Sequence, residues 1–200
     1  APQEYDDFDQ TYGTDTNGLI QPWDLDIDES LMGQAIQYRT ANSRRFNDLL
    51  ASLHIDHGRN CFIDLGSGKG RALLLASRYP FQRIVGVELS PTLHQVAVAN
   101  IDRFRADWQR CRRIESYCGN AANFDWPHLN IVVYLFNPFG AATLKIAMGR
   151  LRASVAAAPR RVCVLYVKPV HRAELEQSAE FRLIDMIDQS AIYSNNRAEC

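Results

Sequence analysis

Three glycines occupy alternate positions directly behind a short apolar run. The run covers residues 61–65, and Gly66, Gly68 and Gly70 follow it. Glycine lets a backbone turn sharply and approach a ligand with no Cβ in the way. A helix that opens at Gly70 would also present free N–H groups in its first turn. The spacing predicts a strand, a loop that holds a ligand closely and a helix, although three glycines can also form only a tight turn.

A carboxylate follows at the end of the next apolar run. Glu88 lies near the end of residues 83–89, which read as the strand beside the loop. At the carboxyl end of a strand, a carboxylate can accept hydrogen bonds from both hydroxyls of a ribose. The alternative is a solvated strand end. Because the glycine loop and Glu88 occur together at this spacing, a nucleoside ligand is favoured.

The loop itself limits the kind of nucleoside. It reads GxGxG, whereas the dinucleotide fingerprint is GxGxxG, and it lacks the four-residue gap that precedes GK[ST] in a P-loop. Asp64, immediately before the turn, would oppose a pyrophosphate but suits a ligand with ammonium and carboxylate groups reached through water. Lys69 is expected to face solvent.

Alternating strand and helix patterns must position these residues. Strands are predicted at 61–65, 83–89, 113–119, 130–139 and 161–169. Helices are predicted at 31–53, 70–80, 141–157 and from the Ser90-Pro91 start through Trp108. Residues 181–188 and 190–194 are too close for an intervening helix and read as an antiparallel pair. The order favours an α/β fold, a mainly parallel sheet with helices on both faces.

The charge of the chain is divided unevenly. Residues 1–30 hold nine acidic residues and no Lys or Arg, which leaves 14 acidic residues against all 22 Lys and Arg in residues 31–200. We therefore predict an acidic N-terminal arm over residues 1–30 and one folded domain over 31–200. The split could place an acidic arm over a basic face or suit the body to an acidic partner, or it could reflect only solvated surfaces.

Metal sites and membrane spans are not indicated. The five histidines show no ligand spacing and the five cysteines include no CxxC pair, so no metal site is expected. No apolar run approaches the roughly 20 residues needed to cross a bilayer. The N-terminal residues lack the order of a signal peptide, and the chain is expected to be cytoplasmic.

Four motifs occur in a characteristic order. DLGSGKG (64–70), VGVELS (85–90), CGNAANF (118–124) and YLFNPF (134–139) resemble the motif series of class I S-adenosylmethionine-dependent methyltransferases, and more closely that of small bacterial members without an assigned substrate. The likeness covers about residues 35–170. It implies a Rossmann-like sheet of seven strands with a terminal antiparallel hairpin, and S-adenosylmethionine as cofactor.

The resemblance also implies a role for each matching position. Gly66, Ser67, Gly68 and Gly70 would form the loop around the methionine part of the cofactor, with Asp64 near its ammonium group. Glu88 would hold the ribose and Leu89 would pack on the adenine, whose ring Ala121 would bond through its backbone N–H. Asn120 replaces the usual acid at the adenine amino group, and its carbonyl can accept the same bond. Tyr38 and Thr40 resemble a segment that closes over the cofactor, or they lie on an ordinary helix surface.

The last motif marks the position of the methyl acceptor in this resemblance. Amino-group methyltransferases often carry [DN]PP[YF] here, whereas this chain has Asn137-Pro138-Phe139, one proline fewer. The predicted function is methyl transfer from S-adenosylmethionine, with these three residues at an amino-type nitrogen of a protein, nucleic acid or small molecule. NPF could instead be a structural turn. The alternatives are a nucleoside-binding regulatory module without turnover and a nicotinamide oxidoreductase.

Overall fold

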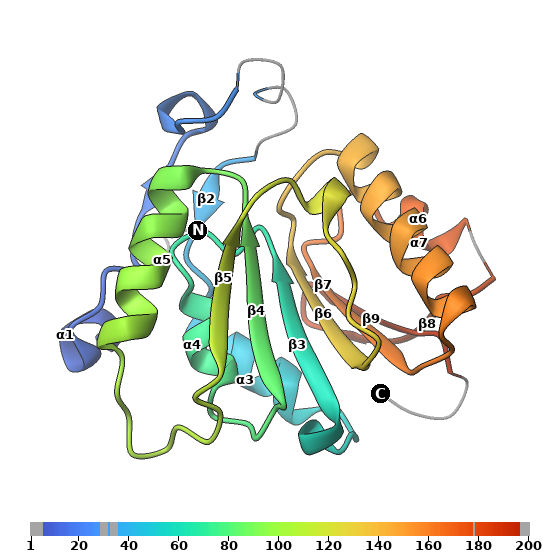
Figure 1. Cartoon of the computed structure of the whole chain (residues 1–200), viewed down its shortest axis with the longest axis horizontal. Helices are drawn as coiled ribbons and strands as arrows, with labels where there is room; N and C mark the ends of the chain where they lie inside the picture. The colour runs from blue at the N-terminus through green and yellow to red at the C-terminus, as the bar shows by residue number, and fades with distance from the viewer. Residues whose placement is uncertain (1–5, 29–31, 33–35, 178, 197–200) are drawn as a thin grey trace.

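The computed structural model describes residues 6–28, 32, 36–177 and 179–196. Seven strands form one sheet in the order β5-β4-β3-β6-β7-β9-β8 (Figure 1). The five strands from β5 to β7 in this order are parallel, and β9 is antiparallel to both β7 and β8, which confirms the predicted sheet. The strands are β3 (Asn60–Leu65), β4 (Arg83–Glu88), β5 (Ile114–Cys118), β6 (Asn130–Phe136), β7 (Val162–Val167), β8 (Arg182–Ile187) and β9 (Ser190–Ser194).

The core has one cluster on each face of the sheet, because successive side chains of a strand point to opposite faces. Phe62 and Ile84 belong to the cluster that includes α3 and α4 side chains. Ile63 and Val85 belong to the cluster that includes α6 side chains. Burial on both faces explains the continuous apolar runs of the central strands. The helices are α3 (Ser43–Ala51), α4 (Arg71–Ala76), α5 (Pro91–Arg103), α6 (Ala141–Ala157) and α7 (Ala173–Glu176).

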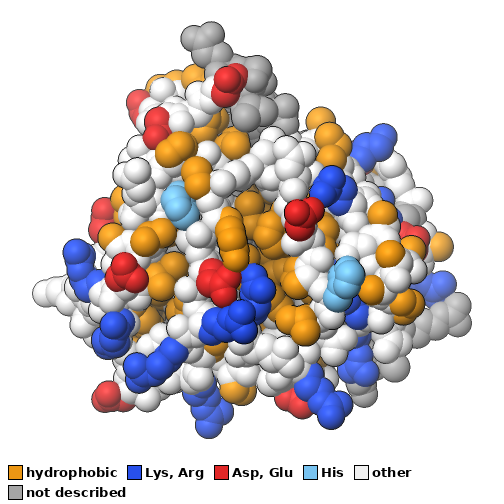
Figure 2. Space-filling view, viewed as in Figure 1, with side chains coloured by type: hydrophobic (Ala, Val, Ile, Leu, Met, Phe, Trp, Pro, Cys, Tyr) orange, Lys and Arg blue, Asp and Glu red, His pale blue; other side chains and the backbone are white. Residues whose placement is uncertain are grey.

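A short segment, residues 121–129, takes the place of a helix between β5 and β6. It forms the 3-10 helix η3 (Ala121–Asn123), and Trp126 is buried against the α6 side of the sheet. Figure 2 shows apolar side chains reaching the surface over the middle of this face, beside acidic and basic residues. The thin cover leaves Tyr117 of β5 45% exposed.

The start of α5 is confirmed, but its end is not. Ser90 Oγ accepts a hydrogen bond from the Leu93 N–H at 3.2 Å, and Pro91 occupies the first turn, where its missing N–H has no cost. The helix ends at Arg103 rather than at Trp108. Phe104 has extended backbone and remains buried, so the predicted apolar stripe continues in a non-helical segment.

The helix predicted over residues 31–53 is wrong in its first part. Tyr38–Arg39 form strand β2, which pairs antiparallel with β1 (Leu19–Ile20). The helix α3 begins only at Ser43, because the Asn42 side chain accepts a hydrogen bond from the Arg45 N–H at 3.0 Å and caps it there. Residues 31 and 33–35 of the predicted helix lie outside the described residues.

The acidic arm is folded against the body. It contains α1 (Phe8–Tyr12), β1 and the 3-10 helix η1 (Pro22–Asp24). The Phe8 ring stacks on Phe104 with centroids 5.8 Å apart, and Trp108 Nε1 donates a hydrogen bond to the Tyr12 hydroxyl at 2.7 Å. The arm therefore contributes to the core. Residue 30, the predicted boundary, lies outside the described residues, and the division into arm and domain stays a prediction.

Within the described residues, no helix is both long enough and apolar enough to span a bilayer. The same residues contain no group of three or more His, Cys, Asp or Glu side chains placed to hold a metal ion.

Candidate functional site

A pocket lies at the carboxyl ends of the central strands. The chain proceeds from β3 to β4 and β5 on one side and from β6 to β7 on the other, so the strand order reverses between β3 and β6. Open α/β sheets bind ligands at this position. The pocket wall brings together most of the predicted site residues, namely Tyr38, Asp64, Gly66, Ser67, Glu88, Leu89, Asn120, Ala121, Asn137, Pro138 and Phe139.

The close contacts of the glycine loop are with protein side chains. A Cβ on Gly68 would collide with the Tyr38 ring, and a Cβ on Gly66 would collide with Pro138. Both glycines have positive φ, +53° and +81°, which side chains rarely adopt. The loop thus accommodates two segments that are distant in sequence and that both border the pocket.

Three predicted site residues lie outside the pocket wall. Gly68 and Gly70 shape the loop, and Gly70 is the N-cap of α4, where a Cβ would lie 3.3 Å from that of Ala97. Thr40 is 7% exposed and donates a hydrogen bond from Oγ1 to the Thr16 carbonyl at 2.9 Å. Thr40 therefore contacts the arm, whereas its neighbour Tyr38 reaches the pocket.

Glu88 closes the loop against the end of β4. Its two carboxylate oxygens each accept one backbone hydrogen bond, from Gly68 N–H at 2.7 Å and from Ser90 N–H at 2.8 Å. Burial raises the pKa of Glu88, and these two hydrogen bonds oppose that rise. A carboxylate oxygen can accept more than one hydrogen bond. Glu88 therefore retains acceptor capacity toward the pocket.

Asp64 is a buried acid without a partner among the described residues. It is 3% exposed, borders the pocket and makes no hydrogen bond or ion pair with a described residue. Burial is the larger cause and repulsion from Glu88 the smaller cause that raise the pKa of Asp64 well above its ordinary value of 3.8. An unpaired buried charge is unfavourable, and buried charges in proteins are normally paired. The site therefore favours a cationic group in the pocket.

The residues after β5 form a different part of the wall. Asn120 Oδ1 accepts a hydrogen bond from the Ala122 N–H at 2.9 Å and caps η3. An adenine amino group that donates a hydrogen bond to this oxygen, as predicted, would share the oxygen with the Ala122 N–H. Leu89 and Ala121 lie in the wall, as the sequence predicts.

The NPF segment presents an unsatisfied polar atom. Asn137 has φ +42°, in the left-handed region that Asn tolerates better than most residues. Its Oδ1 is buried and has no hydrogen-bond partner among the described residues. Phe139 is 8% exposed and belongs to the core cluster on the α6 face. The segment thus combines an anchored ring with a polar group to which no described residue donates a hydrogen bond.

Two features of the site were not predicted. Lys69 does not face solvent, because its Nζ forms an ion pair with Asp15 Oδ1 at 2.7 Å and the side chain is only 13% exposed. Leu25 and Ile27 of the arm border the pocket, while Asp26 between them accepts a hydrogen bond from Ser90 Oγ at 2.5 Å. The apolar–acidic alternation of residues 25–28 carries a period of two that could have indicated this arrangement.

The comparisons with known proteins concern the fold. No protein-family model matches the chain, and no curated protein sequence matches it. The RNA methyltransferase from Salinibacter ruber, crystallised with S-adenosyl-L-homocysteine, is 19% identical with a TM-score of 0.51, over 77% of this chain and 90% of that one. Magnesium protoporphyrin IX methyltransferase from Synechocystis, with bound SAM, is 14% identical with a TM-score of 0.52, over 76% and 77%.

A third similar structure is N,N-8-amino-8-demethyl-D-riboflavin dimethyltransferase from Streptomyces davawensis, 16% identical with a TM-score of 0.55 over 76% of this chain and 53% of that one. Identities this low establish the fold alone. The chain has the Rossmann-like fold of class I S-adenosylmethionine-dependent methyltransferases, and the resemblance found in the sequence is confirmed at that level.

Proposed function

We propose that the chain is a methyltransferase that binds S-adenosylmethionine in the pocket at the ends of β3, β4 and β6. The observation that carries the proposal is the pair of buried acids in one pocket: Asp64 has no partner among the described residues, and Glu88 retains acceptor capacity. Asp64 suits the ammonium group of this cofactor and Glu88 suits its ribose hydroxyls. Ser67, whose buried Oγ has no partner among the described residues, offers a further polar contact.

When bound, the cofactor supplies an activated methyl group for direct displacement. The contribution of the protein is to hold the acceptor in line and to exclude water, and neither task needs a metal. Leu25, Ile27 and Phe136 supply apolar wall around the polar groups. Asp64 would hold the ammonium group in the methionine part of the cofactor and Glu88 would hold its ribose, in the same pocket that Asn137 borders.

The acceptor we propose is an amino-type nitrogen. Asn137 Oδ1, which is buried and has no hydrogen-bond partner in the described part of the chain, would accept a hydrogen bond from an N–H of the acceptor and so aim the nitrogen lone pair. Phe139 would supply a packing surface beside it. The acceptor would belong to a protein, a nucleic acid or a small molecule. The similar structures carry names with varied acceptors, so fold likeness favours none of these classes.

The alternatives predict different ligands or no product. A nicotinamide oxidoreductase would place a pyrophosphate at the loop, where the carboxylate of Asp64 would repel it. A regulatory module would bind the nucleoside without turnover, although it would have no use for the Asn137 oxygen beside the pocket, which has no partner within the described residues.

Titration calorimetry with S-adenosylmethionine, S-adenosylhomocysteine and NAD tests the cofactor. Binding of the first two, abolished by Glu88→Ala and retained by the surface control Asp102→Asn, is expected. Tighter binding of NAD would overturn the proposal. Methyl-labelled cofactor incubated with fractionated lysate then reports the acceptor, and label recovered on oxygen or carbon would remove the amino-type acceptor.

A further inference from the structure

Arg71 is a buried cation that borders the pocket but has no role in the proposed chemistry. It is the first residue of α4, directly after the glycine loop, and its side chain is 2% exposed. Burial of a guanidinium is costly unless its donors are satisfied. The identity of its partners therefore indicates what this residue is for.

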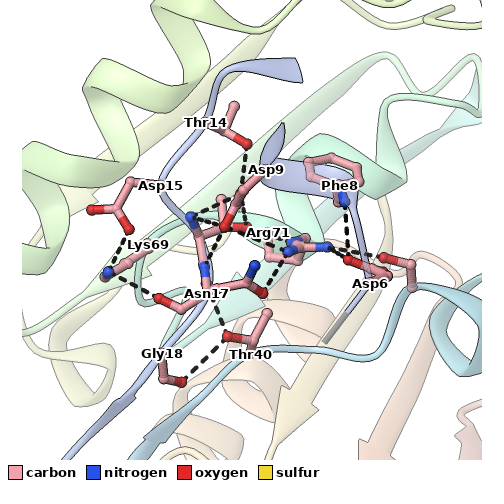
Figure 3. A network of polar contacts seen from close by, with 12 residues as sticks. Asp6, Phe8, Asp9, Thr14, Asp15, Asn17, Gly18, Thr40, Lys69 and Arg71 are labelled. Atoms are coloured by element: carbon pink, nitrogen blue, oxygen red, sulfur yellow. Dashed lines mark hydrogen bonds and ion pairs between the residues drawn. The ribbon is translucent and has the colours of Figure 1, made fainter. Parts of the chain in front are cut away.

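The partners come mainly from the N-terminal arm (Figure 3). Nε donates to Thr16 Oγ1, Nη1 donates to Asp6 Oδ1 at 2.7 Å, and Nη2 donates to Asn17 Oδ1 at 2.9 Å. The guanidinium carbon also lies 4.2 Å from the centre of the Phe8 ring. The planar fork of arginine satisfies several partners at once, which the single ammonium of lysine does not.

The arm loop, residues 14–18, contacts Arg71, and hydrogen bonds to Asp9 fix the conformation of this loop. Asp9 accepts hydrogen bonds from Thr14 Oγ1 at 2.7 Å, from the Thr16 N–H at 2.9 Å and from the Asn17 N–H at 2.7 Å. Burial alone would raise the pKa of Asp9, but these hydrogen bonds together lower it, so the carboxylate stays ionised beside Arg71. Thr16, at the centre of the loop, is fully buried.

The same loop holds a wall of the cofactor pocket. The Tyr38 hydroxyl donates a hydrogen bond to the Thr16 carbonyl at 2.6 Å, and burial raises the pKa of Tyr38 so that this donor remains protonated. The ring of Tyr38 lies over Gly68 and borders the pocket. Contacts therefore run from Arg71 through Thr16 to Tyr38 and to the glycine loop.

A second ion pair, between Lys69 of the glycine loop and Asp15 of the arm, also joins these two segments. Lys69 Nζ contacts Asp15 Oδ1 at 2.7 Å and the Asn17 carbonyl at 3.0 Å. Asn100 of α5 donates from Nδ2 to the carbonyls of both Lys69 and Asp15, at 2.9 and 2.8 Å. The glycine loop is thereby clamped between the arm and α5.

We propose that Arg71 is a positioning residue for the cofactor: it fixes arm residues 14–18, which in turn hold Tyr38 over the glycine loop as a wall of the pocket. This inference rests on the proposed function, because it assigns the arm to the same site. A purely structural role would make the arm a support for the core and leave the affinity of the folded protein unchanged.

The test compares Arg71→Lys, Tyr38→Phe and the double variant in their Kd for S-adenosylhomocysteine, measured well below each melting temperature. Arg71→Lys keeps the charge and loses the fork, and we expect about tenfold weaker binding. Tyr38→Phe keeps the ring and removes the hydrogen bond to the Thr16 carbonyl, and we expect its affinity to fall by a smaller factor than that of Arg71→Lys. The double variant should bind no more weakly than Arg71→Lys, because both changes break one chain of contacts.

The control is Arg152→Lys in α6. Arg152 is also poorly exposed, at 21%, and its Nη2 donates to the Glu174 carbonyl at 2.7 Å, but it does not border the pocket. It should lower the melting temperature and keep the Kd. If Arg71→Lys does not fold, Asn17→Ala replaces it, since this removes one acceptor of the guanidinium.

Two results would overturn the inference. One is a Kd within about twofold of wild type in folded Arg71→Lys or Asn17→Ala, which would leave Arg71 a structural residue. The other is a double variant whose loss equals the product of the two single losses, because independent effects multiply. Absence of binding by the wild-type chain is a separate result, and it would overturn the proposed function.

Discussion

Replacing Asp64 with asparagine removes one negative charge from the pocket and keeps the size of the side chain. A cofactor ammonium about 4 Å from the carboxylate would gain about 4 kcal/mol at an effective dielectric constant of 20. Part of this is offset by desolvation, and the amide oxygen of Asn can still accept a hydrogen bond. We expect a net loss of about 2 kcal/mol, which is about 30-fold in the Kd for S-adenosylmethionine.

The stability of the free protein should change in the opposite direction. Burial and repulsion from Glu88 raise the pKa of Asp64 in the native state above 3.8, its value in the unfolded state. At a pH between the unfolded-state pKa and the native-state pKa, the native state therefore binds a proton that the unfolded state lacks. The free energy of unfolding then falls as the pH rises through this window, by about 1.4 kcal/mol for each unit of pKa difference. Asp64→Asn removes this penalty and should raise the melting temperature at pH 7.

The pH dependence of binding gives an independent readout. The ligand ammonium favours ionised Asp64, so wild-type affinity should rise with pH through the raised pKa of Asp64 and then level off. Titrations below about pH 7 keep the ligand amino group protonated. Asp64→Asn should show a flatter profile, and because Glu88 titrates in both proteins, the difference between the profiles reports Asp64.

Asp102→Asn, a change at an exposed acid of α5, controls for net charge. Weaker binding in Asp64→Asn together with a lower melting temperature would show that Asp64 is stabilised in the free protein by a partner. Unchanged affinity would refute the reasoning directly, since no cation would then lie beside this carboxylate.

Three further changes address the other parts of the site. Glu88→Gln should weaken cofactor binding by about 2 kcal/mol and loosen the loop, because Gln offers one acceptor oxygen where Gly68 and Ser90 each use one; calorimetry measures this, and an unchanged Kd would count against the ribose contact. Asn137→Ala should keep the Kd and lower turnover by about 100-fold, since it misplaces only the acceptor; full activity would make NPF a structural turn. Gly68→Ala should lower the free energy of unfolding by about 1–3 kcal/mol, because of strain at φ +53° and the clash with Tyr38. Adding Tyr38→Ala should relieve the clash. A Gly68→Ala protein that unfolds thermally at the wild-type temperature would contradict this.

The sequence alone determined the order and approximate bounds of the strands around the pocket. The alternation of apolar runs and helix starts located the strands β3 to β9 to within a few residues, because side-chain period and capping are local properties. Asp64 and Glu88 were identified for the same reason: each lies at the carboxyl end of a strand that the pattern indicates. The predicted end of α5 and the predicted start of α3 were wrong, since a helix and an extended chain can bury the side chains of Phe104 and Tyr38 equally well.

Only the tertiary structure decided what these groups contact. The sequence predicts that Gly66 and Gly68 approach something closely, but Pro138 and Tyr38, the side chains that require them to be glycine, come from other segments. Arg71 reads as an ordinary helix residue, yet its partners lie 28 to 65 positions away. Propensity and spacing act over a few residues, whereas a buried ion network depends on how distant segments pack, and that packing is settled only when the whole chain folds.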